Sequence, residues 1–99
     1  MEYSFIWNEE KNTRLKENRA ISFEEISETL HDWESIIDVI PNPNQNKYPN
    51  QRAYALKFKN YFYVVPFVED WDTIFLKTAF PSRQIKEFYF LRQPNEQDT

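Results

Sequence analysis

The sequence predicts a single α+β domain, in which helices pack on an antiparallel sheet. A strand-like segment followed by two helical segments opens the chain, alternating apolar residues then predict several short strands, and an amphipathic segment closes it. The expected order is therefore a strand, two helices, about four further strands and a helix. The 99 residues leave room for one domain, at residues 1–92, and we expect residues 93–99 to form a disordered tail.

The first predicted strand is Tyr3–Trp7, whose aromatic side chains alternate and therefore share one face. Asn8 is a favourable N-cap residue for a helix over Glu9–Asn18. Because Leu15 is the only large apolar residue of that helix, we expect the helix to lie on the surface and to bury little.

The second helix has a stronger start signal. Ser22 and Glu25 have the spacing of a capping box, in which each side chain accepts a hydrogen bond from the other residue's backbone N–H. This pattern predicts a helix from Phe23 to about His31 or Asp32. The residues that recur at helical spacing, and that we expect to face inward, are Phe23, Ile26, Leu30 and Trp33.

A segment rich in Pro and Asn, residues 41–50, follows a predicted strand at Ile36–Ile40. Such residues set turns, so the segment is expected to be a long loop. Long loops in small domains are either functional or mobile, and both interpretations remain open at this point.

The alternation from residue 53 onward predicts a meander of strands. Strands at Ala53–Phe58 and Tyr61–Val68 flank Lys59-Asn60, a two-residue hairpin turn with Asn60 at positive φ. Pro66 cannot donate a backbone hydrogen bond, so we expect it near a sheet edge or a bulge. The remaining expected elements are a strand at Thr73–Phe80 and a helix at Ser82–Leu91.

Composition excludes several classes of site. The chain has no Cys, one His and no Gly, which rules out thiolate metal sites, multi-histidine metal sites and glycine-rich phosphate loops. We expect neither a metal nor a cofactor. Without glycine, positive-φ positions should fall to Asn or Asp. No apolar run reaches the length of a membrane span, so we expect a soluble, cytoplasmic protein without membrane contact.

The formal net charge of −4 conceals an asymmetry along the chain. Residues 1–50 carry five Lys or Arg against ten Asp or Glu, whereas residues 51–92 carry seven against four. A polyanion would therefore meet the second half of the chain.

The segment Ile74–Leu91 contains a predicted strand-to-helix corner at Pro81-Ser82-Arg83. The first backbone N–H groups of a helix have no helical partner and favour anions. A guanidinium beside them can form two hydrogen bonds with a phosphate, so Arg83 is a candidate phosphate-binding residue. The alternative is a surface ion pair between Arg83 and Glu87, four residues later.

Three segments together resemble the BrnT-like toxins. Phe5–Lys11 resembles the family's W-[DN]-x-x-K segment, Ile21–Glu25 its G-[IV]-S-F-E-E segment, and Phe75–Arg83 its P-S-R corner. Three departures from the family pattern stand out: Ala20 is in place of the usual Gly, Gln84 is in place of the common Lys, and Asn18-Arg19 is where many members have a Lys-His pair.

The resemblance implies a RelE-like α+β fold and the toxin of a type II toxin–antitoxin pair. It implies an endoribonuclease that cleaves RNA through the 2′-hydroxyl without a metal and thereby inhibits translation and growth. The implied partner is a BrnA-like antitoxin with a ribbon–helix–helix DNA-binding domain, so that contact with DNA would be indirect, through the antitoxin.

Such cleavage needs a base, a cation for the phosphate and an acid. Arg83 is the candidate cation, Lys77 could face the same groove, and Glu69 could be the base. Lys77 is more readily explained as a solvent-facing strand lysine, and Glu69 is also explained as a turn residue, where acids are expected. The candidate RNA-binding residues are Arg52 and Lys86, which could contact phosphate, and Tyr89 and Tyr63, which could stack on bases or pack in the core.

Two other functions remain open. The chain could be a BrnT-like binding module that partners an antitoxin but does not cleave RNA, as the acidic balance and Gln84 would favour. It could also be an aromatic-rich protein-interaction domain that uses the 41–50 loop.

Overall fold

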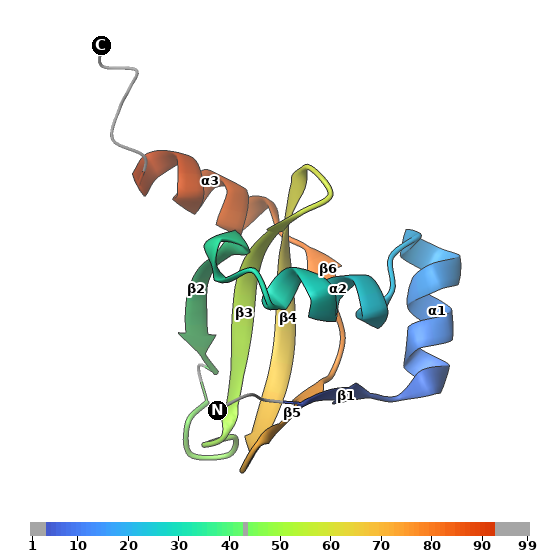
Figure 1. Cartoon of the computed structure of the whole chain (residues 1–99). Helices are drawn as coiled ribbons and strands as arrows, with labels where there is room; N and C mark the ends of the chain where they lie inside the picture. The colour runs from blue at the N-terminus through green and yellow to red at the C-terminus, as the bar shows by residue number, and fades with distance from the viewer. Residues whose placement is uncertain (1–3, 43, 93–99) are drawn as a thin grey trace.

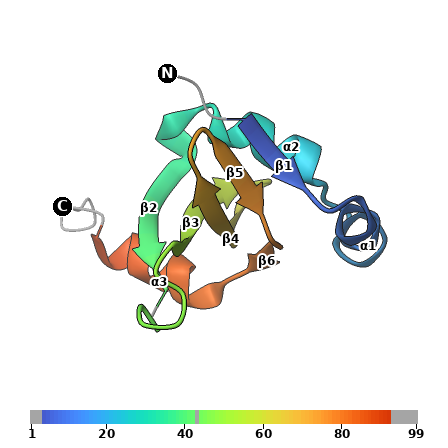
Figure 2. The ribbon, with the colours of Figure 1, turned by 90° about the horizontal axis from the view of Figure 1, so that it is seen from below.

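The computed structural model describes residues 4–42 and 44–92, which form an α+β fold with helices on both faces of one sheet (Figures 1 and 2). The predicted tail at residues 93–99 lies outside the described residues, as does Tyr3.

Among the described helices, none is long and apolar enough to cross a membrane. The elements are β1 (Ser4–Trp7), α1 (Glu9–Arg19), α2 (Phe23–Leu30), a 3₁₀ helix η1 (Trp33–Ser35), β2 (Ile36–Pro41), β3 (Gln51–Phe58), β4 (Tyr61–Asp70), β5 (Thr73–Leu76), β6 (Phe80–Pro81) and α3 (Arg83–Arg92).

The sheet has six strands in the described part of the chain and is mixed, so the prediction of an antiparallel sheet with four strands after the helices is only partly right. The strand order is β1-β5-β4-β3-β2, and β6 pairs with β4. β1 lies parallel to β5, from Ser4 opposite Thr73 to Trp7 opposite Leu76. This pairing joins segments that are far apart in sequence, and no local pattern reveals it.

The predicted strand at Thr73–Phe80 is divided into β5 and β6 by residues 77–79, which have no regular structure. Ala79, in this interruption, is fully buried. On the neighbouring strand β4, the Pro66 carbonyl accepts a hydrogen bond from the Lys77 backbone N–H at 2.8 Å. Pro66 therefore lies inside the sheet rather than at its edge, and its missing N–H falls where β5 has ended and β6 has not begun.

The predicted capping box of α2 is confirmed: the Ser22 hydroxyl accepts from the Glu25 N–H, and the Glu25 carboxylate accepts from the Ser22 N–H, both at 3.1 Å. Trp33, however, is wrongly predicted to face inward, because it is 73% exposed. α2 ends at Leu30, and Asp32 is the N-cap of a separate 3₁₀ turn that begins at Trp33. Trp33 therefore does not continue the buried face of α2. The buried cluster under α1 and α2 includes Leu15, Phe23, Ile26, Leu30, Leu56, Val65, Phe67, Ile74 and Leu76.

The sequence predicts that α1 lies on the surface and buries little, with Leu15 as its large apolar residue. In the structure α1 also buries a polar side chain, Asn12, completely. Its side-chain oxygen accepts from the Phe23 N–H at 2.8 Å, and its amide donates to the Glu24 carboxylate at 2.9 Å. Asn12 thus ties α1 to the first turn of α2. The hydrogen bond from the Asn12 amide to the Glu24 carboxylate lowers the pKa of Glu24 from its usual 4.5. A backbone hydrogen bond and the positive charge of Lys16 act in the same direction.

Four residues of the described chain have positive φ: Ala20, Lys59, Asn60 and Trp71. The expectation that Asn or Asp would take such positions holds at Asn60 alone. Lys59 and Asn60 form the predicted two-residue turn, whose primed geometry requires positive φ at both positions. At the other two positions the fold imposes a conformation that the residue disfavours.

β2 lies at one edge of the sheet and has few free donors. The Asn42 N–H donates to the carbonyl of Gln51, the first residue of β3. Because successive residues of a strand direct their N–H groups to opposite sides, the peptide groups of Val39 and Pro41 point away from β3. The Val39 N–H is held by the Asp38 carboxylate at 2.8 Å, and Pro41 has no N–H. Neither position offers a donor to another strand.

Candidate functional site

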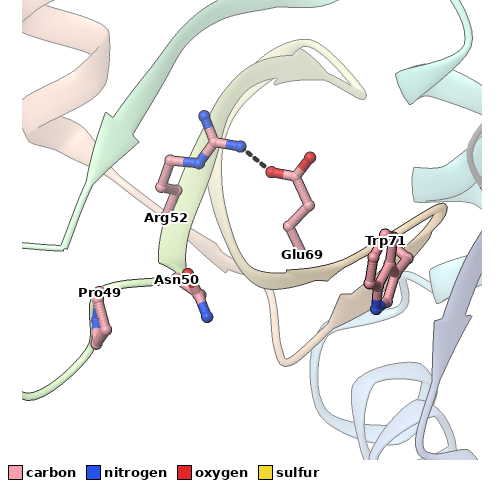
Figure 3. A pocket seen from close by; sticks show the side chains of 5 residues that line it. All are labelled: Pro49, Asn50, Arg52, Glu69 and Trp71. Atoms are coloured by element: carbon pink, nitrogen blue, oxygen red, sulfur yellow. Dashed lines mark hydrogen bonds and ion pairs between the residues drawn. The ribbon is translucent and has the colours of Figure 1, made fainter.

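Two of the predicted site residues, Arg52 and Glu69, meet as an ion pair (Figure 3). Arg52 is the second residue of β3 and Glu69 lies near the end of β4, and the register places Arg52 opposite Phe67. Glu69 is therefore two residues further along the same face, within diagonal reach across the two strands. The Arg52 guanidinium also lies 5.3 Å from the centre of the Phe67 ring, which fixes its position further.

An open cavity of about 440 Å³ lies beside this pair, lined by Pro49, Asn50, Arg52, Glu69 and Trp71. Its walls come from three segments: the 42–50 loop, the paired strands β3 and β4, and the turn between β4 and β5 (Figure 3). The volume lies within the usual range for small-ligand sites. The cavity therefore has room for one nucleotide-sized group next to a cation and a carboxylate.

The described residues of the 42–50 loop, which include Pro49 and Asn50, are held by local hydrogen bonds. The Asn42 side chain accepts from the Asn44 N–H at 2.8 Å and donates to the Gln51 side chain at 2.9 Å. The Tyr48 N–H donates to the Asn44 carbonyl at 2.9 Å. These local hydrogen bonds, one between backbone and side chain, one between two side chains and one between backbone groups, take the place of a regular ladder beside the cavity.

Trp71 is a cavity residue that sequence reasoning missed. It is 92% exposed and sits in the two-residue turn between Asp70 and Thr73, with φ 58°. For a bulky residue this left-handed conformation costs about 1–2 kcal/mol. The signal that could have found it is a tight turn, Asp70-Trp71-Asp72, with a tryptophan where Gly or Asn is expected.

Arg83 and Lys86 lie at the other end of β4. The Ser82 N–H donates to the Phe62 carbonyl at 2.9 Å, which anchors the start of α3 beside the β3–β4 hairpin. Arg83 is exposed, and within the described residues it forms no ion pair with Glu87. The Lys86 ammonium lies 5.5 Å from the centre of the Tyr61 ring.

The two predicted stacking tyrosines take part in packing. The Tyr89 ring lies 5.0 Å from that of Phe62 and helps to hold α3 on the sheet. The Tyr63 ring meets Phe58 edge-to-face at 5.4 Å. Both are only partly exposed, which leaves limited area for a nucleobase.

The predicted site residues therefore do not converge on one point. Tyr63, beside the start of α3, and Glu69 are six residues apart on β4, which corresponds to about 20 Å along the strand. Lys77 lies between the two groups, since its N–H bonds to the Pro66 carbonyl, and its side chain is exposed. The structure joins Arg52 with Glu69 and leaves Arg83 and Lys86 at a separate basic patch.

A second, mostly apolar cavity of about 350 Å³ lies between β2 and α3, lined by Asp38, Ile40, Gln84, Ile85 and Phe88. In the described part of the chain, no group of three or more His, Cys, Asp or Glu side chains could hold a metal ion. Comparisons with family models, curated proteins and solved structures found no match for this chain.

Proposed function

We propose that this protein is the toxin of a type II toxin–antitoxin pair, a BrnT-like endoribonuclease with a RelE-like fold. The resemblance of the segments around Trp7, Ser22 and Arg83 supports the family, and the α+β architecture is compatible with it. The observation that carries the activity is the meeting of Arg52 and Glu69 at the open cavity, because metal-independent cleavage of RNA needs a base beside a cation.

In this mechanism Glu69 accepts the proton of the ribose 2′-hydroxyl as that oxygen attacks the phosphorus. The bond from phosphorus to the 5′-oxygen breaks, and solvent water returns a proton to the leaving oxygen. Arg52 stabilises the charge that accumulates on the phosphate oxygens, and its fork suits two of them. The products are a 2′,3′-cyclic phosphate and a 5′-hydroxyl. Arg83 and Lys86 would hold phosphates several nucleotides away.

An antitoxin would silence this activity most directly by covering the cavity. The proposed partner is a BrnA-like protein with a ribbon–helix–helix domain, and only that partner would contact DNA. A complex that leaves Arg52 and Glu69 open to solvent would argue against this arrangement.

The test is inducible expression of the wild type, Arg52→Ala and Glu69→Gln, with growth and total RNA followed over time. We expect growth arrest and RNA loss with the wild type, and at least about a hundredfold slower cleavage for each variant. Lys57→Ala is the matched control, because Lys57 is an exposed cation on β3 outside the cavity. Arg83→Ala should weaken RNA binding without abolishing cleavage. RNA cleavage at wild-type rates by both cavity variants would refute the mechanism.

Two observations favour a second function, that of a non-cleaving binding module. Arg52 and Glu69 neutralise each other. The start of α3, where Arg83 lies, is next to Tyr63, which is about 20 Å along β4 from Glu69. Under this alternative, the purified chain forms a stable complex with a ribbon–helix–helix protein, and RNA stays intact after the partner is removed. Assay of the released chain on total RNA separates the two functions.

A further inference from the structure

Nothing in the packing of the fold explains why residue 71 is a tryptophan. The Trp71 side chain is 92% exposed, so it contributes almost nothing to the core. Its backbone, with φ 58°, has a conformation that Asn or Gly adopts more readily. Trp71 nevertheless lines the cavity beside Arg52 and Glu69, and it has the largest side chain of the described residues that do so.

We propose that Trp71 is a stacking platform that receives one nucleobase of a single-stranded RNA. The base would lie on the indole face, the Asn50 amide would contact the base edge, and Arg52 would contact the adjoining phosphate (Figure 3). This inference rests on the proposed function and names the substrate class and a recognition residue for that site.

The surrounding charges decide what kind of binding to expect. Asp70 and Asp72 are exposed on either side of Trp71, and both repel phosphate. Among the described residues that line the cavity, Arg52 is the only cation. Binding here must therefore depend on stacking, with about one phosphate contact and a correspondingly shallow dependence on salt. A duplex, whose bases are stacked on each other, cannot offer a base to Trp71.

The chain supplies a matched control for an exposed tryptophan. Trp33 is 73% exposed, but it lies on η1, after α2, and does not line the cavity. Asn tolerates the left-handed conformation, so Trp71→Asn removes the ring while keeping the turn. We expect its melting temperature to equal or exceed that of the wild type.

The experiment measures binding of fluorescein-labelled 2′-O-methyl RNA hexamers by anisotropy, because these RNAs cannot be cleaved through the 2′-hydroxyl. We expect Trp71→Asn to bind at least about tenfold more weakly, Trp71→Phe to retain most of the affinity, and Trp33→Ala to match the wild type. The logarithm of the association constant should fall less steeply with the logarithm of salt concentration for Arg52→Ala than for the wild type, by about 0.7 in slope, because one phosphate contact is lost.

Equal affinity of Trp71→Asn and the wild type for the hexamer would overturn the proposal. The same anisotropy measurement with a labelled Lys- and Arg-rich peptide tests a protein partner instead. If Trp71→Asn weakens binding to this peptide but not to the hexamer, the proposal is overturned in favour of a protein partner. The two proposals fail separately: Trp71-dependent hexamer binding without RNA cleavage contradicts only the endoribonuclease, whereas cleavage without Trp71-dependent binding contradicts only the stacking platform.

Discussion

α2 and α3 lie on opposite faces of the same sheet and differ in how much of their apolar surface the sheet covers (Figure 2). α2 buries Phe23 and Ile26 completely, while α3 leaves Phe90 58% exposed and Leu91 85% exposed. α2 also begins with a reciprocal capping box and is tied to α1 through Asn12, whereas α3 begins with a single serine cap. The α2 face therefore supplies most of the stability, and the α3 side can vary at lower cost to folding.

The sharpest test of this difference pairs two phenylalanines. Phe23→Ala should destabilise the domain by about 3–5 kcal/mol, because its ring is fully buried and stacks on Trp7 at 5.7 Å. Phe90→Ala, on the exposed side of α3, should cost less than about 1 kcal/mol. Urea unfolding followed by circular dichroism measures both, and similar losses would contradict the comparison.

The buried amide of Asn12 gives the next largest effect. Asn12→Ala leaves the Phe23 N–H without its acceptor and should cost about 1–3 kcal/mol. Asn18→Ala is the control, since Asn18 is exposed on the same helix. If both variants unfold at the same urea concentration, Asn12 is not the link between α1 and α2.

The two serine caps should differ by a smaller amount. Ser22→Ala should cost about 1 kcal/mol or more, because the mutation also removes one half of a reciprocal pair. Ser82 accepts from the Ile85 N–H at 3.2 Å, and Ile85 cannot return a hydrogen bond. Ser82→Ala should therefore cost about 0.5 kcal/mol, at the low end of the range for caps. Thermal unfolding of both variants in one buffer tests the order, and the reverse order would refute it.

The smallest expected effect is a dependence on pH at the start of α2. The folded state lowers the pKa of Glu24, chiefly through the Asn12 hydrogen bond, so the charged carboxylate stabilises the fold above the ordinary pKa of 4.5. That stability is lost as the pH falls through the lower, folded-state pKa. The stability difference between the wild type and Glu24→Gln should shrink between about pH 6 and about pH 3. A difference that stays constant over this range would contradict the assignment.

Local signals predicted the elements that depend on neighbouring residues. The capping box at Ser22 and Glu25 and the hairpin turn at Lys59-Asn60 each involve residues within a few positions of one another, and both are confirmed. The parallel pairing of β1 with β5 depends on residues about seventy positions apart, so a single sequence contains no pattern for it. The interruption at residues 77–79 was missed because its residues continue the strand-like alternation.

The candidate site was predictable to a similar extent. Charge and residue type selected Arg52 and Glu69 separately, but only the register of β3 and β4 brings them together. Arg83 was assigned to the strand-to-helix corner correctly, yet the length of β4 separates it from Glu69. Trp71 escaped notice because an aromatic residue in a sequence usually indicates core packing, and exposure is a property of the folded chain.

The outward edge of β2 also bears on how the protein behaves when concentrated. A sheet edge with free N–H groups can recruit a strand from another molecule and start a polymer. Here the Asp38 carboxylate occupies the Val39 N–H, and Pro41 has none, so at these two positions an incoming strand finds acceptors without matching donors. The stretch from Val39 to Pro41 therefore opposes the addition of a strand, and this effect depends on one aspartate and one proline.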